Sequence, residues 1–376
     1  MFTKLKNYSF LSLMSLIILA FSVTSLLLPE KQFSNLENRF LQPMPHFTLE
    51  SFISGTYTTN FEKAMNDQFP LRDNWISLKS RSELLLGKRE NNGIIYGANH
   101  YLFKRFDTFN HENLGKNARA IATFTTKHPN TPIYFMLIPD SYTLHSEFLP
   151  SHIIKVDQNK CINYIYKYIS NTCNINPVNI IPALLRHHDD YIYYRTDHHW
   201  TNLGAYLASY NFICTTGNLP LFPNPLENTC KEVTGFYGTY FNESKFMNIQ
   251  PDTIKYVEPN VSVFIDGKPY PGLYDESKWS SSNKYAAFLW GNNGLTTIIN
   301  NDLPEKGRRL LLIKDSFGNS AAPYLAYNYR QIDIIDLRSI TFSLSDYLLE
   351  HDFDDILIMY NLTTFNNDRN ISKINY

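Results

Sequence analysis

Residues 309–319 read Arg309-Leu310-Leu311-Leu312-Ile313-Lys314-Asp315-Ser316-Phe317-Gly318-Asn319, an apolar run that ends in a polar turn. Short, continuous apolar runs of this kind are typical of strands buried on both faces of a parallel sheet. A helical pattern follows at 321–327, so the polar turn joins a strand to a helix. Ser316 is well placed there as a nucleophile, because its hydroxyl projects above the sheet edge and amides at the helix start can bind an oxyanion.

The same alternation of strand and helix patterns continues on both sides of this run. Further apolar strands are predicted at 132–139, 331–336 and 355–360, together with a strand-like run at 191–194. Helical patterns lie at 111–128, 160–170, 202–212 and 343–350. This alternation predicts an α/β fold, a three-layer sandwich with a mainly parallel sheet. Residues 219–300 are rich in Gly, Pro, Asn and aromatic residues, and we expect them to form an irregular β insertion in that frame.

The N-terminus carries an uncharged, mostly apolar run from Tyr8 to Pro29, preceded by Lys4 and Lys6. Such a run is long enough to cross a bilayer as a helix, and the preceding basic residues favour a cytoplasmic N-terminus. We therefore predict a single-pass membrane protein with a cytoplasmic tail at 1–9 and a transmembrane anchor at 10–28. A cleavable signal peptide is the alternative, and it too would leave the remaining chain outside the cytoplasm.

After the anchor, residues 29–90 are predicted to be a polar linker and a helical lead-in, and residues 91–376 the main domain. The chain has 376 residues, of which 43 % are hydrophobic and 18 % charged, as in globular proteins. The net charge is −1 without a long basic block, which argues against a nucleic-acid-binding protein.

Four cysteines, Cys161, Cys173, Cys214 and Cys230, contain no CxxC pair, which argues against a zinc ribbon or a thioredoxin-like site. An extracytoplasmic location permits disulfides. The local pairings Cys161–Cys173 and Cys214–Cys230 are the first to test, and free buried thiols are the alternative.

The tetrapeptide Asp197-His198-His199-Trp200 brings an acid and two imidazoles together between a strand-like and a helical run. A serine hydroxyl becomes nucleophilic when a histidine takes its proton, and that histidine works best when a carboxylate orients it. In an extended segment Asp197 and His199 would lie on one side and His198 on the other. This favours His199 as the base for Ser316. The alternative is that Ser316 only caps the following helix.

A metal site is a second interpretation of the same histidines. His187, His188, Asp189 and Asp190 lie just upstream, which gives seven possible ligands in thirteen positions with Asp197, His198 and His199. Zinc or manganese could be held by such a set, although no HExxH helix occurs in the sequence.

The run Tyr194-Arg195-Thr196-Asp197-His198-His199-Trp200-Thr201 resembles the signature of the DHHW family of bacterial extracytoplasmic proteins. That family is similar to the SGNH-hydrolase-like proteins that O-acetylate alginate and other exopolysaccharides. Further blocks resemble the family in the family's order: Ser34-xx-Glu37-Asn38-Arg39, Phe61-Glu62, Asn66-Asp67-Gln68-Phe69-Pro70-xx-Asp73, Gly235-Phe236-Tyr237-Gly238-Thr239 and Lys314-Asp315-Ser316-Phe317-Gly318-Asn319.

The resemblance implies an SGNH-like catalytic domain at 91–376 with Ser316 as nucleophile, His199 as base and Asp197 as orienting acid. It also implies a circularly permuted motif order, with the Asp-x-His element before the serine. Lys314 replaces the glycine of the usual Gly-Asp-Ser, which places the family's oxyanion hole in doubt.

Substitutes for that oxyanion hole are the amides of Ser316 and Phe317, or a side chain of Tyr360 or Asn361. Trp200 and Trp290 are candidates for contact with a sugar ring.

The expected function is that of an extracytoplasmic O-acyltransferase or esterase acting on acetyl esters of a cell-surface or secreted polysaccharide through an acyl-serine. No cofactor is implied. The resemblance implies a partner of the membrane-bound O-acyltransferase family that delivers acetyl groups. The alternatives are a non-catalytic polysaccharide-binding or assembly protein and a metal-dependent hydrolase that uses the Asp/His cluster.

Overall fold

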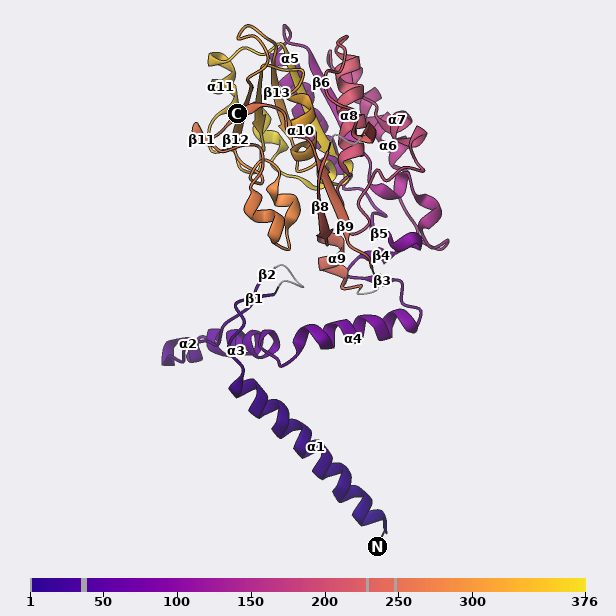
Figure 1. The fold of residues 1–376 in the computed structure, drawn as a ribbon, viewed down its shortest axis with the longest axis vertical. Helices are drawn as coiled ribbons and strands as arrows, with labels where there is room; N and C mark the ends of the chain where they lie inside the picture. Colours follow the sequence, from indigo (N-terminus) through magenta and orange to yellow (C-terminus); the bar gives the residue numbers. More distant parts are fainter. Residues whose placement is uncertain (1, 35–38, 228–229, 247–248) are drawn as a thin grey trace. The chain divides into compact units, whose positions relative to one another are not determined.

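The structure, a computed structural model, describes residues 2–376 apart from 35–38, 228–229 and 247–248 (Figure 1). The family-like block at 34–39 therefore lies mostly outside the described residues. Contacts divide the chain into two units, one made largely of Met1–Lys88 and one of Arg89–Ser244 with Ile249–Tyr376.

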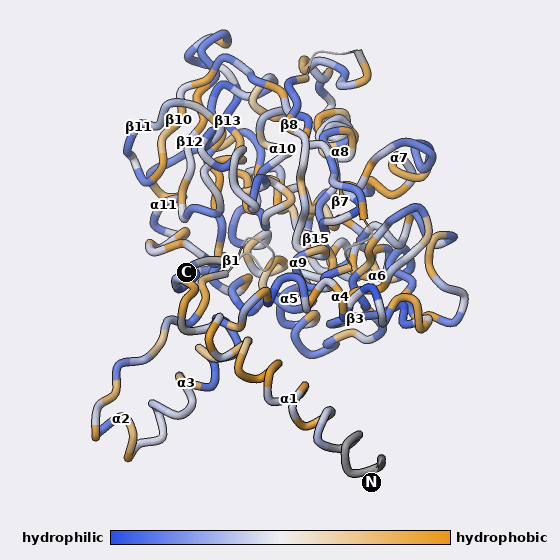
Figure 2. The backbone as a smooth tube through the Cα atoms, turned by 60° about the horizontal axis from the view of Figure 1, so that its bottom comes forward, coloured by the Kyte–Doolittle hydropathy of each residue, from blue (hydrophilic) through white to orange (hydrophobic). Residues whose placement is uncertain are grey.

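The first unit begins with a long apolar helix. Within it, the stretch Tyr8–Ser25 has a mean hydropathy of 1.8 and no buried residue, and Figure 2 shows mostly hydrophobic residues along it. This helix is consistent with a signal sequence or a membrane anchor. The described elements of this unit are α1 (Phe2–Leu27), β1 (Phe33–Ser34), β2 (Arg39–Phe40), α2 (Leu49–Ile53), α3 (Thr56–Asp67) and α4 (Arg72–Leu85).

The second unit is built on an eight-stranded sheet in the order β11-β10-β12-β14-β13-β15-β6-β7. The strands β14, β13, β15, β6 and β7 pair in parallel with their neighbours in this order. The strands β11, β10 and β12 pair antiparallel with one another, and β12 pairs antiparallel with β14. The sheet is therefore mixed but mostly parallel. Its strands are β6 (Ile133–Ile138), β7 (Asn176–Pro177), β10 (Val261–Ile265), β11 (Lys268–Tyr270), β12 (Leu295–Asn300), β13 (Arg309–Lys314), β14 (Gln331–Ile335) and β15 (Asp355–Asn361).

Side chains of the central strands alternate between two hydrophobic clusters, one on each face of the sheet. Leu310 and Leu312 of β13 belong to one cluster, and Leu311 and Ile313 belong to the other. The first cluster is completed by α7 (Ile181–Arg186), α8 (Asn202–Thr215) and α10 (Gly318–Leu325). The second is completed by α5 (His111–Lys127), α6 (Gln158–Ser170), α11 (Leu344–Glu350) and α12 (Leu362–Asn367). The unit therefore has helix, sheet and helix layers, as the sequence predicted (Figure 1).

Smaller elements complete the unit. Two small sheets contain β3 (Glu90–Asn91), β4 (Ile94–Tyr96) and β5 (Leu102–Lys104), and β8 (Lys231–Phe236) and β9 (Asp252–Tyr256), beside the helix α9 (Thr239–Ser244). Short 3₁₀ turns are η1 (Ala98–His100), η2 (Ser141–Thr143), η3 (Ser146–Phe148), η4 (Pro225–Glu227), η5 (Glu276–Ser280), η6 (Lys284–Ala287) and η7 (Ile371–Asn375).

The structure corrects two expectations about strands. The run 191–194 does not join the sheet: it forms one isolated bridge, Tyr193 with Trp200, and β7 pairs with β6 instead. The segment 219–300, expected to be an irregular β insertion in the frame, does contain short strands, but three of them, β10, β11 and β12, belong to the central sheet and extend it in antiparallel fashion beyond β14. We call residues 257–300, which contain these three strands, the antiparallel arm.

The four cysteines are free thiols in the structure. Cys173 donates a hydrogen bond to the carbonyl of Ile169, and the sulfur of Cys230 accepts one from Asn202 Nδ2. Neither of the two local disulfide pairings considered from the sequence is formed.

Candidate active site

Ser316 lies in the turn between β13 and α10, at the carboxyl end of a parallel strand. In the sheet, β13 lies between β14 and β15, and the chain runs from β13 to β14 on one side and then to β15 on the other. Ser316 therefore lies where the strand order reverses direction. α/β proteins commonly bind their ligands at such a switch point. The carboxylate of Asp315 fixes the turn by accepting hydrogen bonds from the amides of Phe317 (3.0 Å) and Asn361 (2.8 Å). Gly318 allows α10 to start directly above the strand, because a Cβ there would lie 2.7 Å from Lys314 Cβ.

The Asp-His-His segment is a tight bend and not the extended segment that we expected. The amide of Tyr194 donates to the carbonyl of His199, and the amide of His199 donates to Asp197 Oδ1 at 3.0 Å. The rings of His198 and His199 consequently lie side by side, with centroids 3.8 Å apart. Strand alternation is therefore the wrong reason for pairing Asp197 with His199; the bend brings them together.

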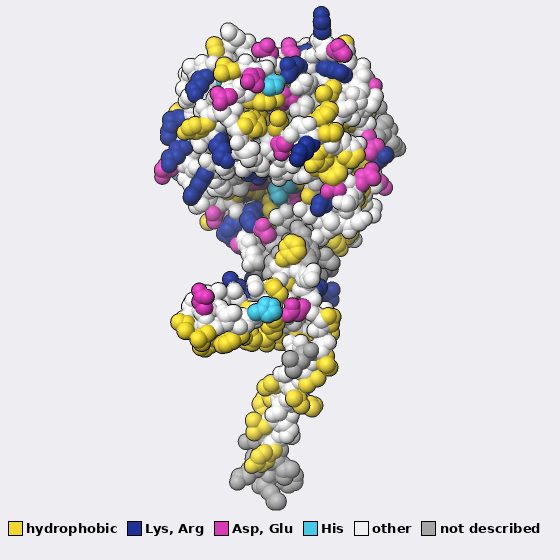
Figure 3. All heavy atoms as spheres, turned by 90° about the vertical axis from the view of Figure 1, so that its left-hand side faces the viewer, with side chains coloured by type: hydrophobic (Ala, Val, Ile, Leu, Met, Phe, Trp, Pro, Cys, Tyr) yellow, Lys and Arg dark blue, Asp and Glu magenta, His cyan; other side chains and the backbone are white. Residues whose placement is uncertain are grey.

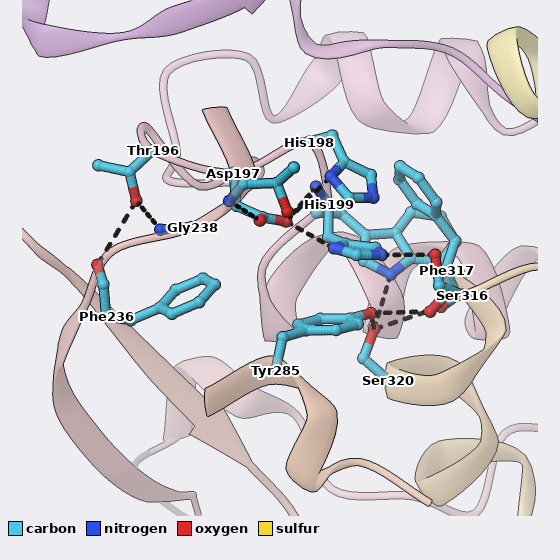
Figure 4. A network of polar contacts seen from close by, with 12 residues as sticks. Thr196, Asp197, His198, His199, Phe236, Gly238, Tyr285, Ser316, Phe317 and Ser320 are labelled. Carbon is cyan, nitrogen blue, oxygen red and sulfur yellow. Dashed lines mark hydrogen bonds and ion pairs between the residues drawn. The ribbon is translucent and has the colours of Figure 1, made fainter. Parts of the chain in front are cut away.

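Asp197, His199 and Ser316 form one chain of hydrogen bonds (Figure 4). His199 Nδ1 lies 2.5 Å from Asp197 Oδ1, and His199 Nε2 lies 2.8 Å from Ser316 Oγ. An ionised carboxylate can only accept, so the proton of a neutral imidazole resides on Nδ1 and leaves Nε2 to accept the serine proton. Asp197 and His199 are buried, at 2 % and 4 % exposure, whereas Ser316 is half-buried.

The charge of Asp197 is held by its surroundings although the side chain is buried. Burial by itself would raise the pKa of Asp197. The imidazoles of His198 and His199 and the amide of Thr239, which donates to Asp197 Oδ2 at 2.7 Å, outweigh that effect. The net result is a pKa well below the usual range of an aspartate, so Asp197 is ionised at neutral pH.

His198 lies beside the hydrogen-bonded chain but outside it. Its Nδ1 is 3.5 Å from Asp197 Oδ1, and about a third of its side chain is exposed. Its packed surroundings, followed by the adjacent ring of His199, lower the pKa of His198 to about 4. His198 is therefore neutral at neutral pH and can act as a polar neighbour of the site.

Tyr285 of η6 connects the base to the nucleophile turn (Figure 4). Its ring stacks on that of His199, with centroids 3.7 Å apart and planes 10° apart. Its hydroxyl lies 3.0 Å from the carbonyl oxygen of Ser316 and 3.0 Å from Ser320 Oγ. The phenol can therefore donate to that carbonyl, fixing the backbone of the turn, while its face orients the imidazole.

The structure corrects the expected role of Trp200. Its side chain is completely buried, and its indole N–H donates to Ser320 Oγ at 2.8 Å. Since Ser320 also contacts Tyr285, the fourth residue of the motif belongs to the network that holds the Ser316 turn. The ring of Trp200 is not available to a sugar.

The expected oxyanion donors are largely engaged elsewhere. The amide of Phe317 is bonded to Asp315, and the side-chain amide of Asn361 donates to Ile138 O and Asp140 Oδ1. Tyr360 is buried at 1 % exposure, and its hydroxyl has no partner among the described residues. In the described part of the chain the backbone amide of Ser316 makes no hydrogen bond, which leaves it as the donor nearest the nucleophile.

Lys314, which stands where a glycine was expected, does not reach into the oxyanion region. It is 2 % exposed, and its Nζ lies 3.3 Å from Asp336 Oδ2 and 3.1 Å from Asn292 Oδ1. Burial lowers the pKa of Lys314, and the charge of Asp336 opposes this effect. Lys314 thus connects the end of β13 to Asp336, which follows β14, and to Asn292 of the antiparallel arm.

The metal interpretation is narrowed to three residues. Among the described residues, possible ligand atoms of Asp197, His198 and His199 lie within 4.8 Å of one another. The upstream residues pair locally, His187 with Asp190 at 2.9 Å and His188 with Asp189 at 3.1 Å, and do not join this group. Because Asp197 Oδ1 and both nitrogens of His199 are already hydrogen-bonded, the arrangement fits proton transfer better than metal ligation.

Comparison with known proteins supplies the family. The family model described as DHHW protein matches residues 106–335, which is more than half of the chain. The chain belongs to the DHHW family. The resemblance drawn from the motif residues is thereby confirmed. No curated protein matches the chain.

Solved structures agree with the fold of this DHHW protein. A DHHW family protein from Eubacterium siraeum is 22 % identical with a TM-score of 0.64, over 76 % of this chain and 95 % of that one. PatB1 of Bacillus cereus is 21 % identical with a TM-score of 0.60, over 75 % of this chain and 99 % of that one. At these identities the similarities show a shared fold alone.

Two contributions to the site of the DHHW protein were missed from the sequence. Thr239 and Gly238 hold Asp197, and Tyr285 holds His199 and the Ser316 turn. The block 235–239 resembles the family, and its two glycines, Gly235 and Gly238, are a signal that a backbone approaches another group closely. Tyr285 carried no comparable signal, because it is one of 26 tyrosines.

Gly238→Ala is expected to damage the site strongly. A Cβ at Gly238 would lie 2.5 Å from Asp197 Oδ2 and 2.7 Å from Asp197 Cα, so the acid or the amide of Thr239 must move. We expect overpacking to cost about 1–3 kcal/mol of stability. Ester turnover should fall by about 10²-fold, since small misplacements of catalytic groups have effects of that size.

Thermal unfolding and initial-rate measurements test this expectation. Gly115→Ala in α5 is the matched control, because the nearest atom to its new methyl belongs to the flexible side chain of Arg119. Unchanged turnover in Gly238→Ala would show that the approach to Asp197 is not needed.

Proposed function

We propose that this DHHW protein is an extracytoplasmic, serine-dependent O-acyltransferase or esterase that acts on acetyl esters of a cell-surface or secreted polysaccharide. The observation that carries the proposal is the continuous hydrogen-bonded chain from Asp197 through His199 to Ser316. The order of the elements, with Asp-x-His before the serine, supports the circularly permuted SGNH-like arrangement that the motif resemblance implies.

In the first half-reaction Ser316 Oγ attacks the carbonyl carbon of the acetyl ester, and its proton passes to His199 Nε2. Asp197 stabilises the imidazolium that forms, because it remains ionised and accepts the Nδ1 proton. The amide of Ser316 is the donor available to the developing oxyanion. Collapse of the tetrahedral intermediate gives acetyl-Ser316, and His199 returns its proton to the leaving alcohol.

In the second half-reaction the acetyl-enzyme is attacked by a second hydroxyl. His199 removes the proton of that hydroxyl, and Ser316 leaves as an alcohol after taking the proton back. A carbohydrate hydroxyl gives transfer, and water gives hydrolysis. The ring of Tyr285 keeps the imidazole in the same plane through both steps, since it stacks on His199.

The proposed placement in the cell is a single-pass membrane protein with residues 1–9 in the cytoplasm, 10–28 in the membrane, 29–90 as linker and lead-in, and 91–376 as catalytic domain. Two features of the first unit support an uncleaved anchor. Phe21 of α1 stacks on Phe69, with centroids 5.4 Å apart, so the apolar helix packs against the lead-in. Leu71, just before α4, and Trp75 and Leu78 within it are exposed apolar side chains at the spacing of one helix face.

The proposed partner is a protein of the membrane-bound O-acyltransferase family that delivers the acetyl group from inside the cell, as the motif resemblance implies. The surface does not favour a polyanionic partner such as nucleic acid. Lysine and arginine are intermixed with aspartate and glutamate on the face drawn in Figure 3, and the net charge is −1.

Sulfonyl labelling tests the proposed nucleophile directly. Sulfonyl fluorides react with activated serines, and the related PatB1 has been captured with a sulfonyl adduct. We expect the full chain in detergent to gain one phenylmethanesulfonyl group, mapped by peptide mass spectrometry to Ser316. Ser345→Ala is the control that should label normally, because Ser345 bonds only to backbone near the C-terminus. Labelling that persists unchanged in Ser316→Ala would contradict the proposal.

A further inference from the structure

The antiparallel arm contains a cavity that is not part of the hydrogen-bonded chain around Ser316. Its volume is about 620 Å³, within the range of small-ligand sites. Its walls come from the connection between β9 and β10 and from the segment after β11. The lining residues are Glu258, Pro259, Asn260, Val261, Pro271, Gly272, Leu273, Tyr274, Asp275, Glu276, Ser277 and Trp290.

The charge of this cavity is one-sided. Three carboxylates, Glu258, Asp275 and Glu276, line it, and no lysine, arginine or histidine does so among the described residues. Glu258 is paired with Lys231 at 2.5 Å, and Asp275 uses Oδ1 to cap η5 through Ser277. The carboxylate of Glu276 forms no hydrogen bond or ion pair within the described chain, so it can accept from a ligand. Carboxylates accept from hydroxyl and ammonium donors and repel an anionic ligand.

Trp290 also lines this cavity, and its backbone conformation is unusual. Leu289 and Trp290 both have positive φ, 53° and 59°, which side chains other than glycine rarely adopt. Such conformations persist where the surroundings enforce them, and they cluster at functional sites. The indole N–H donates to the carbonyl of Gly272 at 2.9 Å, and Tyr270 packs edge-on at 4.9 Å. The ring is therefore fixed in orientation before any ligand arrives.

The loop that carries Trp290 also contacts the Ser316 turn. Asn292, two residues further on, accepts hydrogen bonds from Lys314 Nζ and Asn319 Nδ2, both at 3.1 Å. Lys314 and Asn319 flank Ser316 in sequence. The position of the tryptophan is thus coupled to the position of the nucleophile through one short loop.

A second connection runs through aromatic rings. Tyr274, in the cavity wall, packs against Phe288 at 5.5 Å, and Phe288 packs against Tyr285 at 5.1 Å. Tyr285 stacks on His199. A ligand held in the cavity would therefore rest on the same rigid cluster that holds the base.

We propose that this cavity is a glycan subsite that takes a sugar residue without negative charge, an uncharged or amino-bearing one, and rejects uronates. An aromatic face packs against the C–H face of a sugar ring, while carboxylates accept hydrogen bonds from its hydroxyl or ammonium groups. The inference deepens the proposed function by naming the charge class of the polysaccharide, and its test measures binding and not turnover.

Calorimetric titration of the full-length Ser316→Ala protein in detergent tests the subsite with three named probes. These are cellotetraose, which is neutral, a chitosan tetramer, which is cationic, and tetramannuronate, which is anionic. We expect saturable binding of the first two and none of the third. Adding Trp290→Ala should weaken both complexes by about tenfold or more, the loss expected for one stacking partner. Adding Glu276→Gln should weaken the complex with the cationic chitosan tetramer more than the complex with neutral cellotetraose.

Matched controls are Trp75→Ala in the first unit and Glu305→Gln on the surface of the second, which should bind as the parent does. Glu276→Gln tests the subsite without disturbing the strained loop, since Glu276 is exposed. Three outcomes would overturn the inference. One is that Trp290→Ala and Glu276→Gln bind the probes as tightly as the parent does. The others are tight binding of tetramannuronate and no binding of either cellotetraose or the chitosan tetramer. Sulfonyl labelling of Ser316 separates the two proposals: labelling without glycan binding contradicts the subsite alone, and binding without labelling contradicts the acyl transfer alone.

Discussion

Ser316→Ala is expected to lower kcat/KM for hydrolysis of 4-nitrophenyl acetate by about four orders of magnitude. The hydroxyl is the atom that forms the acyl bond, and its distance of 2.8 Å from His199 Nε2 is that of a serine ready for deprotonation. In other serine enzymes the loss of one member of such a group removes nearly all of the covalent pathway. The residual rate should match that of solvent water attacking the bound ester.

The control for this substitution is Ser345→Ala, measured with and without EDTA. Both variants should keep the circular dichroism of the parent, because the Ser316 hydroxyl has His199 Nε2 as its side-chain partner and removing it leaves the carbonyl bond to Tyr285 in place. Turnover that survives in Ser316→Ala and disappears with EDTA would exclude the serine mechanism and favour a metal held by Asp197, His198 and His199.

Asp197→Asn is expected to reduce turnover by about 10³–10⁴-fold while the chain remains folded. The carboxylate accepts from His199 Nδ1, from the amide of His199 and from the amide of Thr239. An asparagine has one oxygen, so its amide group must face one of these donors. If the NH₂ group of the introduced asparagine faces the imidazole, it donates to Nδ1 and the ring proton moves to Nε2. A protonated Nε2 can no longer accept the proton of Ser316 Oγ.

The pH dependence of the same variant follows from the direction of the pKa shift. The pKa of Asp197 in the folded chain lies below its unfolded value, so its charge stabilises the fold above the unfolded pKa, about 3.9. That stabilisation is lost as the pH falls through the lower, folded pKa. The parent should therefore melt at a higher temperature than Asp197→Asn. This difference in melting temperature should be largest from pH 5 to 8 and should shrink as the pH falls below about 4. Asp189→Asn, which changes an almost fully exposed carboxylate, should show no such gap.

The parallel half of the sheet was predictable because its strands carry their own signal. β6 is apolar throughout, and β13 and β15 are apolar at every position between their two end residues, as expected of strands covered on both faces. The run 191–194 has a similar composition, yet its side chains enter the hydrophobic cluster from a loop. Apolar composition reports burial, whereas sheet pairing depends on partners that are distant in sequence.

The same limit applies to the site. Asp197, His199 and Ser316 stand in short motifs with a chemical meaning, and the structure places them within hydrogen-bonding distance of one another. The groups that hold them are not local: Thr239 reaches Asp197 across 42 positions, and Tyr285 comes from the antiparallel arm. The amide of Phe317 was a wrong prediction for the oxyanion hole for a related reason. The sequence does not reveal that this amide already donates a hydrogen bond to Asp315 Oδ1.

The pairing of β12 with β14 has a practical consequence for anyone who shortens this protein. Loops and insertions on a surface can often be trimmed, because few hydrogen bonds cross into them. Here, removal of the antiparallel arm would strip β14 of a partner bonded along its whole length, from Gln331 to Ile335. The bared edge would offer unpaired amides and carbonyls to other molecules and promote association between chains. A truncated form should therefore aggregate.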